Sequence, residues 1–136
     1  MSRKAKKSSK KARAKSDTKV ISLALSGSGN HIVKSGDVIP GTDGDILIDQ
    51  SIKKIRFEYA TGTGTFALFI LRFTPDPGQG GSPHESPFAA RVYITDDGEL
   101  EKQIKPNPKK GRYQYRLALL DGNGNLITED PQIIVQ

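Results

Sequence analysis

The chain has 136 residues, of which 35% are hydrophobic and 26% are charged, and its formal net charge is +6. This length fits one domain of ordinary size. The sequence contains no cysteine, which excludes a disulfide scaffold, thiolate metal sites and cysteine nucleophiles.

The positive charge is concentrated at the N-terminus. Residues 1–19 hold nine of the 21 basic residues and one of the 15 acidic residues, so they carry +8 and the remaining 117 residues carry −2. This segment has no aromatic residue, and Met1 is its only large aliphatic residue. It cannot bury enough apolar surface to offset an ordering cost of roughly 1–2 kcal/mol per residue. We therefore predict a disordered Lys-rich arm over 1–19 and a folded domain over 20–136.

A lysine-rich arm is suited to binding phosphate polymers. Each lysine that neutralises a phosphate releases a counterion, and this attraction does not depend on nucleotide sequence. Two alternatives remain open: a solvated tail that only aids solubility, and a nuclear-targeting address in R-K-A-K-K and K-K-A-R. The residues predicted to contact nucleic acid or another polyanion are Arg3, Lys4, Lys6, Lys7, Lys10, Lys11, Arg13, Lys15 and Lys19.

The first apolar run gives an expectation about location. Val20 to Leu25 is interrupted by Ser22 and is followed by Ser-Gly-Ser-Gly. The run is too short and too polar for a signal peptide or a membrane span. We therefore expect a cytoplasmic protein without membrane insertion.

From Val20 onward the chain is punctuated by glycine, proline, asparagine and aspartate, and no long stretch keeps a helical apolar period. Short strands separated by turn residues are typical of an all-β sandwich or barrel. Eight runs are predicted to form strands: Val20 to Leu25, His31 to Lys34, Asp45 to Asp49, Lys53 to Tyr59, Thr65 to Phe73, Phe88 to Thr95, Arg112 to Leu120 and Gln132 to Val135.

Three of these runs alternate between apolar and polar residues, as half-buried antiparallel strands do. Their predicted core faces are Ile55, Phe57 and Tyr59; Phe88, Ala90, Val92 and Ile94; and Tyr113, Tyr115, Leu117 and Leu119.

The run from Thr65 to Phe73 is apolar on both faces. Phe66, Leu68 and Ile70 are predicted on one face, opposite Ala67, Phe69, Leu71 and Phe73. Such a strand is expected to be central in its sheet and covered on both faces, or else its second face meets another protomer.

The segment G-R-Y-Q-Y-R-L-A-L, from Gly111 to Leu119, resembles the penultimate strand of immunoglobulin-like and cupredoxin-like sandwiches. The resemblance implies that Tyr113 takes the corner-tyrosine position and that Tyr115 replaces the usual cysteine. The turn D-G-N-G-N and the last strand D-P-Q-I-I-V resemble those of small uncharacterised bacterial proteins of the DP-EP type. Copper is not implied, because cupredoxin sites require a cysteine thiolate.

Catalytic and metal-binding patterns are weak. His84 lies in a loop with Ser82, Glu85 and Ser86, but neighbours in sequence rarely have the geometry of a catalytic triad. We therefore interpret His84 as an exposed loop histidine.

Lys105, Lys109, Lys110 and Arg112 form a basic patch beside Tyr113 and Tyr115. One interpretation is a surface that cooperates with the arm and stacks bases on the two rings. The alternation favours the other, a lysine-rich loop with both rings facing the core.

Two aspartate turns have oxygen ligands that suit calcium. Asp121, Asn123 and Asn125 have the spacing that opens an EF-hand loop, but the later ligands are missing. Asp43, Asp45 and Asp49 form a second acidic group. Hairpin turns explain both groups, so no metal, cofactor or catalytic residue is predicted.

The sequence thus predicts an all-β chain with a single antiparallel β-sandwich, immunoglobulin-like or cupredoxin-like, behind a disordered basic arm. The expected function is a non-enzymatic binding or interaction module whose arm contacts nucleic acid or another polyanion. The sandwich is a candidate for binding a protein or for self-association. A structural assembly subunit of the capsid type is the alternative, and a hydrolase or metal-dependent enzyme is disfavoured.

Overall fold

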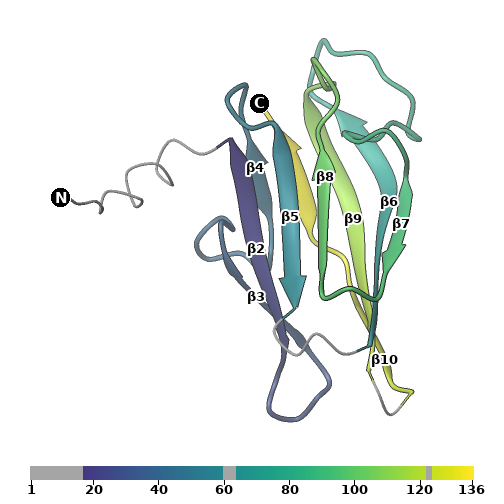
Figure 1. The fold of residues 1–136 in the computed structure, drawn as a ribbon. Helices are drawn as coiled ribbons and strands as arrows, with labels where there is room; N and C mark the ends of the chain where they lie inside the picture. The colour runs from purple at the N-terminus through teal and green to yellow at the C-terminus, as the bar shows by residue number, and fades with distance from the viewer. Residues whose placement is uncertain (1–16, 60–63, 122–123) are drawn as a thin grey trace, which may run out of the picture.

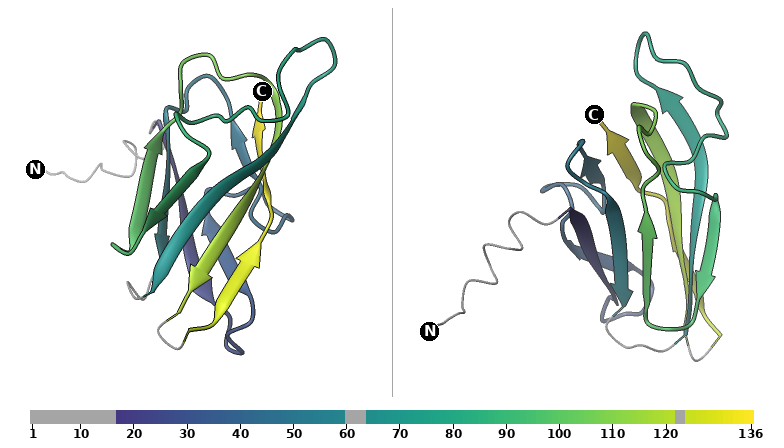
Figure 2. Two further views of the ribbon diagram at one scale, coloured as in Figure 1. Left: turned by 90° about the vertical axis from the view of Figure 1, so that its right-hand side faces the viewer. Right: turned by 45° about the horizontal axis from the view of Figure 1, so that its top comes forward.

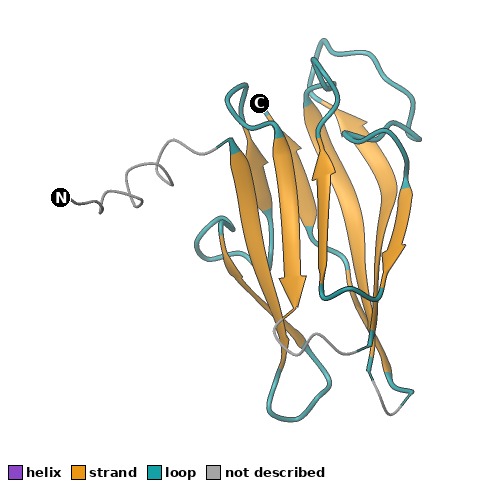
Figure 3. Cartoon of the chain, viewed as in Figure 1, coloured by secondary structure: helices purple, strands orange, loops and turns teal. Residues whose placement is uncertain are grey.

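The computed structural model describes residues 17–59, 64–121 and 124–136. These residues form ten β-strands, β2 to β11, arranged as two sheets that pack face to face (Figure 1). The described residues contain no helix (Figure 3), and therefore none long and apolar enough to cross a membrane. The predicted arm lies outside the described residues, apart from its last three positions.

The four-stranded sheet has the order β3-β2-β5-β8. Its strands are β2 (Thr18–Leu25), β3 (Ile32–Gly36), β5 (Lys54–Tyr59) and β8 (Glu99–Gln103). The six-stranded sheet has the order β4-β11-β9-β6-β7, and β10 also pairs with β9. Its strands are β4 (Ile46–Ile48), β6 (Thr65–Pro75), β7 (Val92–Thr95), β9 (Gly111–Leu120), β10 (Leu126–Glu129) and β11 (Gln132–Val135).

The predicted β-sandwich is confirmed, with mixed rather than purely antiparallel sheets. β2 pairs with β5 in parallel, and β11 pairs with β4 in parallel. All the other pairings between described strands are antiparallel. Folded structure also begins earlier than expected, because β2 includes Thr18 and Lys19.

Alternating side chains from the two sheets fill the core. The predicted core faces of β5 and β9 are confirmed, because every residue of both sets is buried. Phe57 joins the two sheets, with ring centroids 5.6 Å from Phe66 and 6.0 Å from Tyr115. Closely packed aromatic rings of this kind dominate the energetics of a core.

Strand β6 is central, between β9 and β7, as predicted. The predicted face of Phe73 is wrong. A register irregularity between Ile70 and Arg72 adds one residue at Leu71, and such a bulge reverses the faces of the side chains that follow. Phe73 is therefore buried and stacks on Tyr113 at 4.4 Å. On the outer face Phe69 and Leu71 are only partly buried.

Strand β7 corrects a second expectation. Val92 is 50% exposed and Ile94 is 66% exposed, so their predicted core face points outward. Tyr93 is the residue that packs against the core. Phe88 is buried, but it lies before the strand, which begins at Val92. The predicted alternation from Phe88 to Thr95 is therefore not a single strand pattern.

Candidate functional site

The predicted arm joins the sandwich beside the start of β5. Thr18 pairs with Lys54 in parallel register, and the Lys53 amide donates a hydrogen bond to the Asp17 carbonyl at 2.6 Å. Lys19, the last predicted arm residue, lies in β2. The two segments that meet at this junction therefore both carry lysine.

A cleft of about 440 Å³ opens at the same end of the molecule. It lies between the turn from Asp49 to Lys53, the loop from Gln103 to Lys110 and the C-terminal residues Val135 and Gln136. Figure 1 shows these segments at the same end of the sandwich as the start of β2. The charged side chains that line the cleft are three lysines and one aspartate: Lys53, Lys105, Lys110 and Asp49.

Asp49 contributes an ionised carboxylate to this cleft, which its local contacts stabilise. The carboxylate of Asp49 accepts hydrogen bonds from the Ser51 hydroxyl at 2.5 Å and the Ser51 amide at 2.8 Å. These bonds lower the pKa of Asp49, and the charge of Lys19 acts in the same direction. One of the three cleft lysines is already paired, because the Lys105 ammonium lies 3.5 Å from the Glu85 carboxylate.

Tyr113 anchors the lysine-rich loop in front of β9. Its hydroxyl donates to the Lys109 carbonyl, four residues upstream, at 2.7 Å. This is the hydrogen bond of a tyrosine corner, as the resemblance implied. Burial raises the pKa of Tyr113, which keeps the hydroxyl protonated as a donor.

Gly111 brings the backbone of β9 close to β6. Its φ is +150°, and a Cβ atom there would lie 2.3 Å from the Thr74 carbonyl oxygen. Only glycine fits such a close approach.

Tyr113 and Tyr115 are both fully buried, so their rings cannot stack on bases, as the alternation predicted.

The polar side chains beside His84 contact other groups of the described chain. The His84 amide donates to the Ser82 hydroxyl at 3.1 Å, and the Ser86 hydroxyl donates to the Ala90 carbonyl at 2.7 Å. Glu85 faces Lys105. The serine hydroxyls therefore bond the loop backbone, and the carboxylate faces a lysine rather than the imidazole.

The two aspartate turns behave as structural turns. Asp121 accepts from the Asn125 amide at 2.9 Å and closes the hairpin between β9 and β10. Asn123 lies outside the described residues. The second acidic group does not gather around one point: Asp45 accepts from the Gln132 amide at 2.9 Å, whereas Asp49 bonds Ser51.

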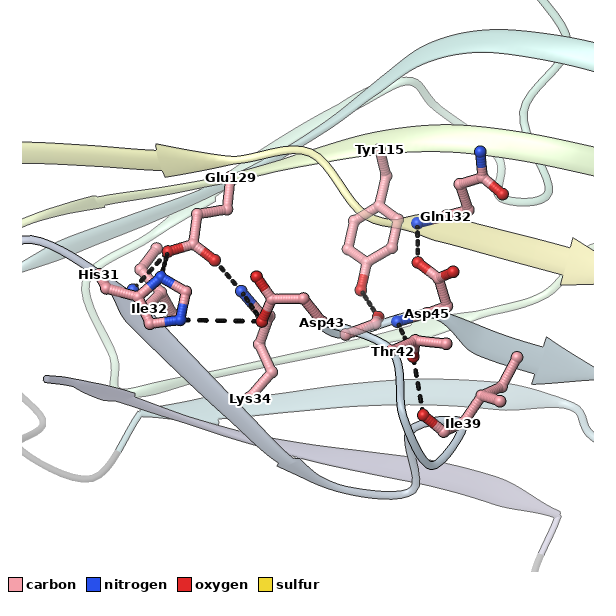
Figure 4. Close-up of polar contacts among 11 residues, drawn as sticks. His31, Ile32, Lys34, Ile39, Thr42, Asp43, Asp45, Tyr115, Glu129 and Gln132 are labelled. Carbon is pink, nitrogen blue, oxygen red and sulfur yellow. Dashed lines mark hydrogen bonds and ion pairs between the residues drawn. The ribbon is translucent and has the colours of Figure 1, made fainter.

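The remaining aspartate, Asp43, belongs to a polar cluster with His31, Lys34 and Glu129 (Figure 4). Glu129 reaches from β10 to the edge strand β3 of the other sheet. Its carboxylate accepts hydrogen bonds from the Ile32 amide at 2.6 Å and from the Lys34 ammonium, and it also pairs with His31 Nδ1 at 2.5 Å. The cluster thus bridges the two sheets where their edges meet.

A metal ion is a natural candidate for this cluster. One imidazole and two carboxylates are ligands that Zn²⁺ accepts, and ligand atoms of His31, Asp43 and Glu129 lie within 4.8 Å of one another. The fully buried side chain of Lys34 occupies the same region, with its ammonium 3.1 Å from Asp43 and in contact with Glu129.

The stem of Lys34 packs against the backbone of Gly44. A Cβ atom on Gly44 would lie 2.5 Å from its Cδ, so the glycine backbone packs directly against the lysine stem. Because the Lys34 ammonium already pairs with two of the three candidate ligands and would repel a metal ion beside it, we interpret the cluster as an ion-pair clamp between the sheets. The sequence did not reveal this cluster, because Glu129 is 95 residues from Lys34 and His31 is a single histidine at the start of a predicted strand.

Comparison with known proteins adds one weak structural likeness. No family model matches the chain, and no curated protein matches it. Among solved structures, reduced rusticyanin shows a TM-score of 0.30 and 14% sequence identity, covering 89% of this chain and 81% of its own. At that level the likeness carries no argument about function. The resemblance to DP-EP-type proteins stays a prediction.

Proposed function

We propose that the protein is a non-enzymatic β-sandwich binding module whose basic arm, together with the adjoining end of the sandwich, contacts nucleic acid or another polyanion. The observation that carries the proposal is the placement of charge. Lys53, Lys105 and Lys110 line the cleft at the end where the arm joins. A phosphate polymer held by the arm therefore meets further lysines instead of the acidic body that net charge suggested.

The buried tyrosines define the kind of binding. With Tyr113 and Tyr115 fully buried, the basic end lacks the stacking contribution of these two rings. Binding that rests on phosphate contacts is insensitive to sequence and sensitive to salt. The expected ligand is therefore any flexible phosphate polymer, including single-stranded nucleic acid and inorganic polyphosphate.

A binding assay with labelled single-stranded DNA tests the proposal. The full chain is compared with a chain lacking residues 1–16, which keeps β2 intact because that strand begins at Thr18. Affinity should fall at least tenfold (about 1.4 kcal/mol) on removal of the arm. Equal affinities at low salt would overturn the proposal.

A second pair of variants separates the body from the arm. Replacing Lys53 and Lys110 by glutamine should weaken binding further, because both line the cleft. Replacing Arg72 and Arg116 by glutamine removes the same charge from the outer face of the six-stranded sheet, where the two residues lie on β6 and β9. If both double variants weaken binding equally, the basic end is not a site and only net charge matters.

A structural assembly subunit is the second candidate. It is favoured by one observation: exposed apolar side chains gather on the outer face of the six-stranded sheet. A basic arm in front of a β-sandwich is also the layout expected of a subunit that packages RNA, although this is an analogy of architecture alone.

A further inference from the structure

The cleft beside the arm is lined by more than lysines. Ile52, Pro106 and Pro108 add apolar side chains to its walls. Four residues with side-chain amides also line it, and all four are exposed: Gln50, Gln103, Asn107 and Gln136. The right-hand view of Figure 2 brings this end of the sandwich toward the viewer. The cleft therefore offers cations, apolar surface and neutral hydrogen-bonding groups to one ligand.

The four amide side chains are available to that ligand. In the described ranges 17–59, 64–121 and 124–136, none of them hydrogen-bonds another residue, and the Gln50 contact with the Lys53 ammonium at 3.1 Å is made by the backbone carbonyl. Each amide carries both donors and an acceptor. A phosphate group that binds lysines offers acceptor oxygens only, whereas the edge of a nucleobase offers donors and acceptors that Asn and Gln match. The amides therefore indicate a ligand that contains a base.

Asn107 is held in an unusual backbone conformation. Its φ is +51°, and it is the one non-glycine residue with a positive φ in the described part of the chain. Pro108 follows it, and a residue before proline is pushed toward extended backbone. Residues kept in sparsely populated conformations concentrate at sites that contact ligands. The conformation of this wall residue is therefore a second indication of binding.

Backbone hydrogen bonds hold the walls of the cleft in place. The Ile104 amide donates to the Lys53 carbonyl at 2.7 Å, and the Lys105 amide donates to the Pro87 carbonyl at 2.9 Å. The tyrosine corner holds the same loop further along the chain. A site that is formed before its ligand arrives loses less conformational freedom on binding.

We propose that the cleft binds one nucleotide unit of a single-stranded nucleic acid, with the phosphate against the lysines and the base among the amides and apolar side chains. This inference rests on the proposed function and specifies its ligand. The cleft volume of about 440 Å³ lies within the range of about 300–1,000 Å³ that holds small organic ligands. It suits one nucleotide rather than a duplex.

The charges in the walls set the orientation of the nucleotide. Lys110 forms no ion pair with another described residue, whereas Lys105 already faces Glu85. Asp49, on the turn before β5, repels a phosphate, but a carboxylate accepts hydrogen bonds from the amino group of a base. The phosphate is therefore expected at Lys110, on the loop between β8 and β9, and the base toward the turn that carries Asp49.

Isothermal titration calorimetry of the full chain with AMP, adenosine and inorganic phosphate tests the proposal. AMP should bind about tenfold or more tighter than either of the other two, because only AMP joins a base to a phosphate. AMP is too short to need the arm, so this measurement reports on the cleft.

Substitutions separate recognition of the base from recognition of the phosphate. Gln103→Ala should weaken AMP binding about threefold to tenfold, as expected for one lost hydrogen bond, and leave phosphate binding unchanged. Asn107→Gly should do the same, because glycine keeps the positive φ while the amide is removed. Lys110→Gln should weaken binding of AMP and of phosphate alike. Gln114→Ala is the matched control, since Gln114 is an exposed strand glutamine on the outer face of the six-stranded sheet.

Tighter binding of AMP that Gln103→Ala weakens and Gln114→Ala preserves supports the proposal. AMP that binds no more tightly than inorganic phosphate, or a Gln103→Ala variant that binds AMP as the unmodified chain does, would overturn it. Loss of single-stranded DNA binding on removal of residues 1–16 would then still support the proposed function, because that deletion tests the arm separately. Equal DNA affinities with and without the arm, together with no preference for AMP, would overturn both.

Discussion

The two sheets share one core but turn different faces outward. On the four-stranded sheet, Arg56 pairs with Glu58 at 2.6 Å and with Glu99 at 2.5 Å. On the six-stranded sheet, outward-facing positions of β6 and β7 hold apolar residues such as Phe69 and Ile94. The first face is built for water. The second also carries an ion pair, Arg116 with Asp130, but it exposes the apolar side chains of Val92 and Ile94 on β7.

The largest effect should come from breaking the contact that joins the two sheets at their edge. Glu129→Ala removes one of the two carboxylates that pair with the fully buried Lys34 side chain and leaves only Asp43 beside it. Removing one partner of a buried ion pair costs about 3–5 kcal/mol. The expected loss is about 3 kcal/mol, at the lower end of that range, because Glu129 retains 14% exposure. The loss in free energy of unfolding is measured by urea denaturation of the variant and the unmodified chain.

The adjacent Asp130→Ala variant is the control. Asp130 pairs with Arg116, whose side chain is 42% exposed, and a pair of this kind contributes less than about 1 kcal/mol. If the two variants lose similar stability, the clamp at the edge does not hold the sheets together.

A smaller effect is expected at Tyr115 in the shared core. Its hydroxyl donates to the Gly44 carbonyl at 2.7 Å, so Tyr115→Phe leaves that carbonyl unpaired and costs about 1–3 kcal/mol. Burial raises the pKa of Tyr115 well above its ordinary value. A raised folded-state pKa gives stability that is fully present below the unfolded pKa, near 10, and is lost as pH rises through the folded value.

The free energy of unfolding, measured from neutral to strongly alkaline pH, tests whether stability falls as Tyr115 titrates. The unmodified chain should lose stability above about pH 10. The difference in free energy of unfolding between it and Tyr115→Phe should therefore become smaller there. A difference that stays constant at every pH would show that the buried hydroxyl does not titrate as proposed.

The smallest effect is expected on the charged outer face. Arg56→Ala removes a network in which the Arg56 side chain is 28% exposed, and it should cost less than about 1 kcal/mol. Added salt should reduce that cost by screening. Ile94→Lys, on the outer face of β7, should change the free energy of unfolding by no more than about 0.5 kcal/mol, because Ile94 is 66% exposed. A large loss of folding stability in Ile94→Lys would mean that this face belongs to the core.

Local pattern predicted much of the fold. The alternation of Ile55, Phe57 and Tyr59 placed β5 correctly, and the strand that contains Tyr113 ends at Leu120 as predicted. Two strands were not predicted, because E-L-E-K-Q and L-I-T-E hold only three large aliphatic residues between them. Their pairing comes from neighbours that the local sequence does not reveal.

The errors arose where tertiary structure overrides a simple period. The extra residue at Leu71 directs the side chain of Phe73 toward the core. No turn residue in the sequence marks that bulge. The clamp could not be predicted either, since Lys34 and Glu129 meet only after both sheets have formed. In contrast, the charge difference between the arm and the body was visible from composition alone. What composition could not show is that three body lysines line the cleft beside the arm.

The salt dependence of binding tests the central claim most directly: that the arm and the lysines of the adjoining cleft bind phosphate polymers by charge. The measurement is the slope of log affinity for single-stranded DNA against log salt, for the full chain and for Lys53→Gln with Lys110→Gln. A steep negative slope is predicted for the full chain, at about 0.7 for each single-strand contact, and the double variant should flatten it by one to two contacts. A slope near zero, or one unchanged in the double variant, would contradict the account.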